Sequence, residues 1–202
     1  MKNINVLAPV NNLGYGVASI NICSALSRRG VRVCLFPIGQ PSFSSEQEAM
    51  IISPMIQSQG SFDPKAPCLK IWHEHSMGER IGTGRFVGFP FFEINSFDGP
   101  RVNHLSSCDE IAVSCDWAKE IVESQVPNSV VHTVPLGVDT SVFTAIPPTK
   151  SDKFVFFNCG KWEKRKGHDL LLNLFMRAFR EESDVELWMM CDNPFLPPEH
   201  QS

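Results

Sequence analysis

Positive charge is not in excess in this sequence. Its 202 residues hold 18 lysine and arginine residues against 22 aspartate and glutamate residues, which gives a formal net charge of −4. A chain of this sign lacks the broad basic field that attracts nucleic acid or an anionic membrane surface. We therefore expect no nucleic-acid partner, and any site for an anion has to be built locally.

Long apolar runs are also missing. No stretch reaches the roughly 18 to 20 apolar residues that a membrane-spanning helix needs. The apolar part of the first residues, MKNINVLAPV, is too short and too interrupted for a signal peptide. We therefore expect no transmembrane segment.

Paired cysteine spacings are absent too. The chain has seven cysteines but no C-x-x-C, and most of them lie in apolar runs such as VRVCLF and FNCG. This pattern indicates reduced thiols in the core of a cytoplasmic protein rather than a disulfide framework.

Short β-rich runs alternate with helical patterns over residues 1–139. The expected strands are INVLAPV, VRVCLFPI, CLKIW, FVGFPFF, EIAVS and SVVHTVP. The expected helices cover residues 16–29 (ending at Gly30), 45–59 (broken or kinked at Pro54), 99–107 and 116–125. This alternation is typical of a parallel sheet covered on both faces, a Rossmann-like α/β domain.

The sequence pattern changes at residues 140–152. The segment TSVFTAIPPTKSD has neither helical nor strand periodicity, which predicts a linker. Residues 153–202 then predict a strand, a helix and a strand, an incomplete second domain too small for a core of its own. We expect this unit to pack on the first domain, to associate with a second copy, or to be completed by another chain. Five apolar residues recur at helical spacing in it: Leu171, Leu174, Phe175, Ala178 and Phe179.

The segment GKWEKRKG, residues 160–167, lies between the expected strand KFVFFNCG and this helix. Ligands of open α/β folds bind at the carboxyl edge of the sheet, and a helix N-terminus favours phosphate. Gly160 and Gly167 relax the backbone there, so Lys161 and Lys166 can bracket a diphosphate, with Arg165 nearby. A solvated basic turn is the alternative interpretation.

Two further loops follow expected strands. Gly14 and Gly16 let backbone amides approach an anion, or they simply make a tight turn. Ser19 stands where a dinucleotide fingerprint has its third glycine, and VRVCLF has no terminal acid for a ribose, which argues against a dehydrogenase.

His73 and His75, with Cys68 nearby, suggest a metal site, but no further ligand spacing supports one. The other alternative is that both are loop histidines with no functional role.

The segment GKWEKRKG resembles the phosphate-binding turn of GT-B glycosyltransferases, particularly the retaining glycosyltransferase family 4. Gly160, Lys166 and Gly167 match that pattern, and Lys161 stands where arginine is usual. Lysine keeps the positive charge but cannot make the bidentate hydrogen bonds of a guanidinium group. The resemblance extends over most of the chain through NNLGYGVASINICSALSRRG, IWHEHSMGERIG, FPFFEINSF, SCDWAKEIV and PLGVDTSVF.

The resemblance implies transfer of a sugar from a nucleotide diphosphate sugar to an unknown acceptor, with no cofactor and no metal. His73 takes the place of the family's cleft histidine near the donor sugar, and His75 and Glu93 fall on the acceptor side. Lys161 and Lys166 would stabilise the departing diphosphate. The implied diphosphate-binding residues are Gly14, Gly16, Gly160, Lys161, Arg165, Lys166 and Gly167.

One departure from the family pattern is large. The family's complete second domain carries a Glu-x7-Glu pair, whereas no two glutamates of this chain are eight positions apart. We therefore expect a truncated form whose catalysis needs the rest of that domain. Two alternatives stay open: a non-catalytic phosphate- or sugar-nucleotide-binding module that retains the fold, and a nucleotide-sugar epimerase of the same architecture.

Overall fold

The computed structural model describes residues 2–147 and 152–193. The chain divides into two compact units, Met1–Asp139 and Thr140–Ser202, and each is described by itself. Residues 140–147 form turns and irregular backbone. The rest of the predicted linker up to residue 151, and the last nine residues of the predicted second domain, lie outside the described residues.

A six-stranded sheet in which every pairing is parallel forms the centre of the first unit. Its strand order is β2-β1-β3-β4-β5-β6. The strands are β1 Lys2–Ala8, β2 Val31–Pro37, β3 Cys68–Trp72, β4 Phe86–Pro90, β5 Glu110–Val113 and β6 Val131–Thr133. The predicted Rossmann-like α/β fold is thereby confirmed.

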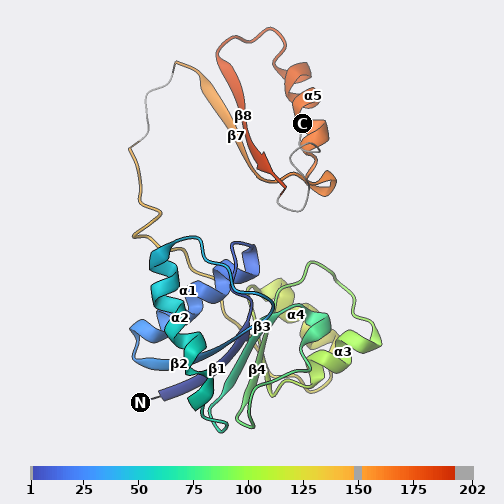
Figure 1. The fold of residues 1–202 in the computed structure, drawn as a ribbon. Coiled ribbons are helices and arrows are strands. Elements are labelled where there is room, and N and C mark those ends of the chain that lie inside the picture. The colour runs from blue at the N-terminus through green and yellow to red at the C-terminus, as the bar shows by residue number, and fades with distance from the viewer. Residues whose placement is uncertain (1, 148–151, 194–202) are drawn as a thin grey trace. The chain divides into compact units, whose positions relative to one another are not determined.

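Helices flank this sheet. They are α1 Gly14–Arg28, α2 Glu46–Gln57, α3 Gly99–Ser106 and α4 Asp116–Gln125, with short 3-10 turns η1 Ser58–Ser61 and η2 Glu74–Ser76. Figure 1 shows α1 and α2 beside β2. Helix α4 packs against β5 and β6, and α3 packs against η2. No helix among the described residues is long and apolar enough to cross a membrane.

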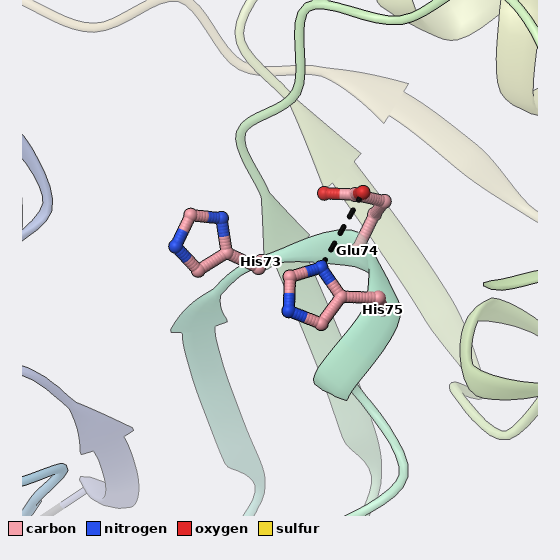
Figure 2. A group of neighbouring side chains, drawn as sticks. All are labelled: His73, Glu74 and His75. Atoms are coloured by element: carbon pink, nitrogen blue, oxygen red, sulfur yellow. Dashed lines mark ion pairs between the residues drawn. The ribbon is translucent and has the colours of Figure 1, made fainter.

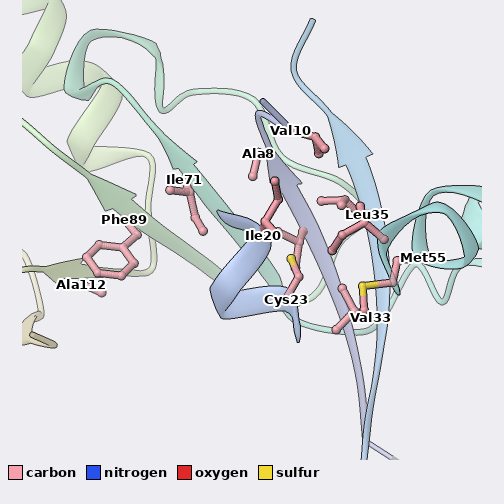
Figure 3. Packing of buried hydrophobic residues seen from close by; sticks show 12 residues of the cluster. Ala8, Val10, Ile20, Cys23, Val33, Leu35, Met55, Ile71, Phe89 and Ala112 are labelled. Carbon is pink, nitrogen blue, oxygen red and sulfur yellow. The ribbon is translucent and has the colours of Figure 1, made fainter. Parts of the chain in front are cut away.

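Two apolar clusters cover opposite faces of the sheet. Ala112 belongs to one cluster, whereas its neighbours Ile111 and Val113 belong to the other, because successive side chains of a strand point to opposite faces. The first cluster joins α1 and α2 to the sheet and is drawn in Figure 3. The second joins α3 and α4 to β5 and β6. Burial on both faces explains the continuous apolar runs of these strands.

Helix α2 is not broken at Pro54, so one of the two predicted outcomes is wrong, and the other, a kink, stays a prediction. The helix runs on to Gln57 with Pro54 inside. Proline removes the hydrogen bond to the carbonyl of Met50, but Met50 is exposed, so water can satisfy that carbonyl. The helix start is also well anchored, since the Ser45 side chain accepts a hydrogen bond from the amide of Glu48.

The end of α1 agrees with the prediction. Gly30 has a φ of +74°, a left-handed conformation that glycine adopts without strain. Its amide donates to the carbonyl of Ser27 at 2.9 Å. Gly30 therefore ends the helix in the way the sequence predicts.

The second unit contains two parallel strands, β7 Phe154–Lys161 and β8 Val185–Asp192. A 3-10 turn, η3 Lys164–Lys166, and helix α5 His168–Ala178 connect them. The rings of Phe175 and Phe179 pack against Phe156 of β7. Leu174, predicted on the same face, is exposed. The described part of this unit thus covers its helix only partly.

All seven cysteines are free thiols, and three of them, Cys23, Cys34 and Cys68, are buried. Burial raises the pKa of Cys23 to about 12, so it stays a neutral core residue. The prediction of core thiols is wrong for Cys115 and Cys159, which are both exposed. Cys159 lies on β7, whose residues are all exposed or half-buried.

Candidate functional site

The strand order reverses between β1 and β3. The chain leaves β1 through α1 toward β2 on one side, and it leaves β3 toward β4 on the other. Ligands of open α/β sheets bind outside the carboxyl ends of the strands at such a reversal. Gly14 and Gly16 follow β1, and His73 follows β3. The structure therefore brings these predicted site residues to one edge of the sheet.

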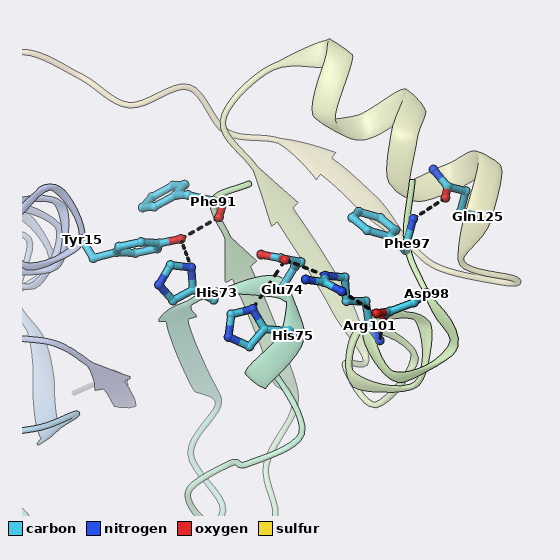
Figure 4. Close-up of polar contacts among 9 residues, drawn as sticks. All are labelled: Tyr15, His73, Glu74, His75, Phe91, Phe97, Asp98, Arg101 and Gln125. Carbon is cyan, nitrogen blue, oxygen red and sulfur yellow. Dashed lines mark hydrogen bonds and ion pairs between the residues drawn. The ribbon is translucent and has the colours of Figure 1, made fainter. Parts of the chain in front are cut away.

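Tyr15, the only tyrosine of the chain, bridges this edge. Its hydroxyl oxygen lies 2.6 Å from the backbone oxygen of Phe91 and 3.0 Å from Nδ1 of His73 (Figure 4). Its ring packs against Trp72, His73 and Phe91, with centroids 5.3, 4.6 and 5.2 Å away. Residues of the segments that follow β1, β3 and β4 therefore meet at one hydroxyl group.

The Tyr15 hydroxyl stays protonated at neutral pH. Burial raises the pKa of Tyr15, and the charges of Glu74 and Glu93 raise it further. Glu93, predicted on the acceptor side, is exposed in the loop after β4. Its charge therefore acts on the same edge of the sheet as His73.

His73 is half-buried and neutral at pH 7. Burial lowers the pKa of His73, and the charge of His75 lowers it further, against the opposite effect of Glu74. The neutral ring keeps one nitrogen with a lone pair and one with a proton. His73 can therefore both donate and accept a hydrogen bond.

The loop carrying both histidines is held by an ion pair between a buried carboxylate and a half-buried guanidinium. Glu74 is buried, and its Oε1 accepts a hydrogen bond from Nε of Arg101 at 2.9 Å. The same guanidinium donates to Asp98 at 2.5 Å, and Asp98 caps α3 by accepting from the Arg101 amide. The ion pair therefore ties η2 to the start of α3 and fixes the backbone on both sides of Glu74.

We expect that replacing Glu74 by glutamine makes the free energy of unfolding depend less on pH in the acid range. Burial alone raises the pKa of Glu74, but hydrogen bonds from Arg101, the backbone and His75, with the charge of His75, bring it below its ordinary value. The carboxylate therefore stabilises the fold above the unfolded pKa of about 4.3, and this is lost as pH falls through the folded pKa.

Urea unfolding at a series of pH values tests this expectation. At pH 7 the E74Q variant should be less stable than the unmodified protein by about 2 kcal/mol, and the gap should close below about pH 4. The E120Q variant, at an exposed position of α4, serves as the control and should follow the unmodified protein. A gap that persists unchanged at low pH would contradict the role of the charged pair.

His73, Glu74 and His75 also form a group whose ligand atoms all lie within 4.8 Å of one another (Figure 2). Glu74 is engaged by Arg101, whose positive charge opposes a second cation. The two imidazole rings lie within 18° of parallel with centroids 5.0 Å apart, so their lone pairs lie in nearly parallel planes and do not converge. As arranged, the group is an ion pair beside two stacked rings. That the activity needs no metal stays a prediction.

Gly14 and Gly16 have different roles. Gly14 begins α1, and a Cβ atom there would meet nothing within 4 Å. A Cβ atom at Gly16 would lie 2.1 Å from the backbone oxygen of Asn11 and 2.5 Å from its nitrogen. Close packing of the turn against the helix therefore requires Gly16, whatever the turn binds.

The remaining predicted residues lie in the second unit, at the carboxyl end of β7 and in the turn that follows it. Gly167 has a φ of +69°, in the left-handed region, and stands between η3 and α5. The ammonium of Lys166 lies 3.4 Å from where a Cβ atom of Gly160 would be. The structure therefore brings Gly160, Lys166 and Gly167 together in one turn at the carboxyl end of a parallel strand.

Glu163 modifies the charge of this turn. Its carboxylate lies 2.5 Å from Nζ of Lys161 and 3.3 Å from Nε of Arg165. The hydrogen bond from Lys161 lowers the pKa of Glu163 most, and the positive charges of Lys161, Arg165 and Lys166 lower it further, against the effect of burial. Two of the predicted diphosphate-binding cations therefore gather around a carboxylate of the chain itself.

A hollow of about 320 Å³ lies beside the turn, lined by Trp162, Glu163, Lys164, His168 and Asp169. Trp162 stacks on the buried His168, with ring centroids 5.3 Å apart and planes 15° from parallel. Neither Lys161 nor Lys166 lines this hollow. In this structure the two lysines thus do not converge on the hollow that the turn forms.

Three residues of these arrangements were not anticipated as contacts from the sequence. Tyr15 stands between the two glycines of its turn, and that position was the available signal. Arg101 reaches a carboxylate 27 positions earlier, which no local pattern indicates. Glu163 is visible in the basic segment, but its pairing depends on the backbone path of η3.

The chain matches no protein-family model, and no curated protein matches it significantly. The functional argument therefore depends on the geometry of the two groups of residues and on their chemistry.

Proposed function

We propose that this chain is a glycosyltransferase of the GT-B type that takes its sugar from a nucleotide diphosphate sugar. The observation that carries the proposal is the turn after β7, where Lys166 folds over Gly160 and the left-handed Gly167 leads into α5. It is supported by the position of His73 at the strand reversal of the first unit. Both are carboxyl ends of parallel strands, where ligands of such sheets bind.

The chemistry of sugar transfer needs positive charge near the departing diphosphate. As the bond from the anomeric carbon to the phosphate oxygen breaks, negative charge grows on the diphosphate and the sugar gains oxocarbenium character. Preorganised cations and helix amides stabilise that charge. In the proposed enzyme Lys161, Lys166 and the first turn of α5 take this role.

Glu163 favours a second candidate, a module that binds a phosphate without reaction. Its carboxylate already neutralises part of the charge of Lys161 and Arg165. A bound diphosphate would have to exchange with this carboxylate for both cations. Binding through Lys166 and the helix amides alone would hold the ligand without stabilising a leaving group.

Incubation with UDP-, GDP- and ADP-sugars, with released nucleoside diphosphate and bound ligand measured in parallel, tests both candidates. Release of the diphosphate supports the enzyme, and binding without release supports the module. If none of these nucleotide sugars binds and none releases its diphosphate, both candidates are overturned. An altered sugar without an acceptor would instead indicate an epimerase.

The K166M variant should weaken binding of the nucleoside diphosphate about tenfold, because a charged hydrogen bond to phosphate contributes roughly 1.5 kcal/mol. The R177M variant removes the same charge from the far end of α5, where Arg177 is exposed. It should bind as the unmodified protein does. Equal losses in both variants would show that only overall charge matters.

We further propose that a second copy of the chain covers apolar surface of the second unit. Phe157 of β7 is 63% exposed, and α5 carries exposed leucines as well. Exposed apolar surface and the open edges of a two-stranded sheet favour association.

A further inference from the structure

Lys70 of β3 is a charged residue in the interior of the first unit. Its side chain is 1% exposed, and its Nζ lies 3.4 Å from Oε2 of Glu79, whose own side chain is 84% exposed. Among the described residues, Glu79 is the only hydrogen-bond partner of this ammonium group, which carries three protons. A strong contact of this kind is about 2.7 to 2.9 Å long. A buried charge therefore depends on one long contact to a carboxylate that water reaches.

Glu79 lies in a strap, residues 77–84, that follows η2 and leads to β4. The strap returns along β3 in the direction opposite to the strand. Glu79 pairs with Lys70, and two residues later the Ile81 amide donates a hydrogen bond to Sγ of Cys68 at 3.3 Å. The strap therefore lies along the strand that carries the buried ammonium group.

Both ends of the strap are held by packing. Met77 is 0% exposed and belongs to the second apolar cluster. A Cβ atom on Gly84 would lie 2.1 Å from the backbone oxygen of Ala66, so backbone packs directly on backbone at this end. Residues 78–80, in contrast, are all exposed. The middle of the strap is therefore held by hydrogen bonds and charges rather than by buried apolar side chains.

We propose that Lys70 and Glu79 form an electrostatic clasp, and that the middle of the strap, residues 78–82, opens as a unit when the clasp separates. Burying an ammonium group costs free energy that one long ion pair offsets only in part, whereas in the open state water hydrates both charges. Gly78 and Gly82 bound the segment, and glycine absorbs a change of backbone dihedral angles with the least strain.

The open state differs from the closed state in which groups reach the surface. Opening exposes the primary amine of Lys70, which the closed state hides. The Glu74–Arg101 pair holds the chain before the strap, so the loop of His73 does not have to move with it. The device lies within the first unit and does not depend on the proposed sugar transfer.

Pulsed acetylation of lysine amines in the folded full chain, followed by mass spectrometry, tests the opening. Lys70 should react more slowly than the exposed Lys65 but faster than the whole protein unfolds. In the E79Q variant we expect Lys70 to react about tenfold faster, because loss of a charged contact shifts an equilibrium by roughly that factor. The E123Q variant, which loses the partner of Lys119 on α4, is the matched control and should react as the unmodified protein does. Acetylation of Lys70 only at the rate of global unfolding would overturn the proposal.

Hydrogen exchange at the Ile81 amide measures the strap itself. The E79Q variant should speed this exchange about tenfold. Methionine at position 70 keeps the length of the side chain and removes its charge, so E79Q should have no effect in the K70M background. Equal acceleration in both backgrounds would show that Glu79 holds the strap without Lys70, and the clasp would be wrong.

The dependence on salt gives a readout that does not need the K70M variant to fold. Screening weakens a contact to an exposed carboxylate. Added sodium chloride should therefore speed acetylation of Lys70 in the unmodified protein and leave the E79Q variant unchanged. The same response in both proteins would contradict the clasp.

Discussion

Alanine at position 16 is expected to destabilise the first unit by roughly 3 kcal/mol. The new Cβ atom would lie 2.1 Å from the backbone oxygen of Asn11, and no side-chain rotation relieves a contact with backbone. Alanine gains about 1 kcal/mol over glycine in a helix interior, which is too little to offset this clash. The turn between β1 and α1 must therefore shift, and Tyr15 beside it must move as well.

The G14A variant is the matched control, because a Cβ atom there meets nothing within 4 Å. Its stability in urea should equal or slightly exceed that of the unmodified protein. If G16A were as stable as G14A, Gly16 would be free of steric constraint, and its prediction as an anion-binding residue would gain weight. A loss in G16A alone indicates that the glycine is needed for packing.

Truncation of Ile71 to alanine is expected to cost about 3 kcal/mol. The Ile71 side chain is 0% exposed and belongs to the cluster that joins β3 to α1 and α2. Removing its methyl groups leaves a cavity that the surrounding strands cannot close, because β3 is paired on both sides. The same strand carries His73 at its end, so we expect the His73 resonances to change too.

Leu174 offers the contrast, since it is 56% exposed on α5. Its truncation to alanine should change stability by less than about 0.5 kcal/mol if the second unit stays uncovered. A cost similar to that of I71A would mean that this leucine is buried in solution. Sedimentation of the unmodified chain then shows whether a second copy covers it, and a monodisperse monomer would contradict the proposed association.

The sheet of the first unit could be predicted because its strands are short apolar runs separated by helical patterns. The helix Asp116–Gln125 has the predicted bounds, since Trp117, Ala118, Ile121 and Val122 mark one face. Of the break or kink predicted at Pro54, the break does not occur, because the carbonyl that the proline frees belongs to the exposed Met50. Strand order, which places β3 beside β1, depends on tertiary packing and was not predicted.

The candidate site was predictable in position but not in its contacts. His73 follows a strand in the sequence, so its place at the sheet edge could be expected. Its partner Tyr15 is 58 positions away, and only the pairing of β1 with β3 brings the two together. The pairing of Lys161 with Glu163 was missed for another reason. The sequence shows both charges, but only the bend of η3 brings the carboxylate onto the lysine.

The single tyrosine at the strand reversal makes the chain easy to label. Incorporating a fluorinated tyrosine would introduce one fluorine nucleus, and it would stand against His73, Trp72 and Phe91. Its one resonance would report on motion of this edge without interference from any other position. Slow separation of Tyr15 from His73 and Phe91 would broaden that resonance. A small molecule that binds beside Tyr15 would change its chemical shift.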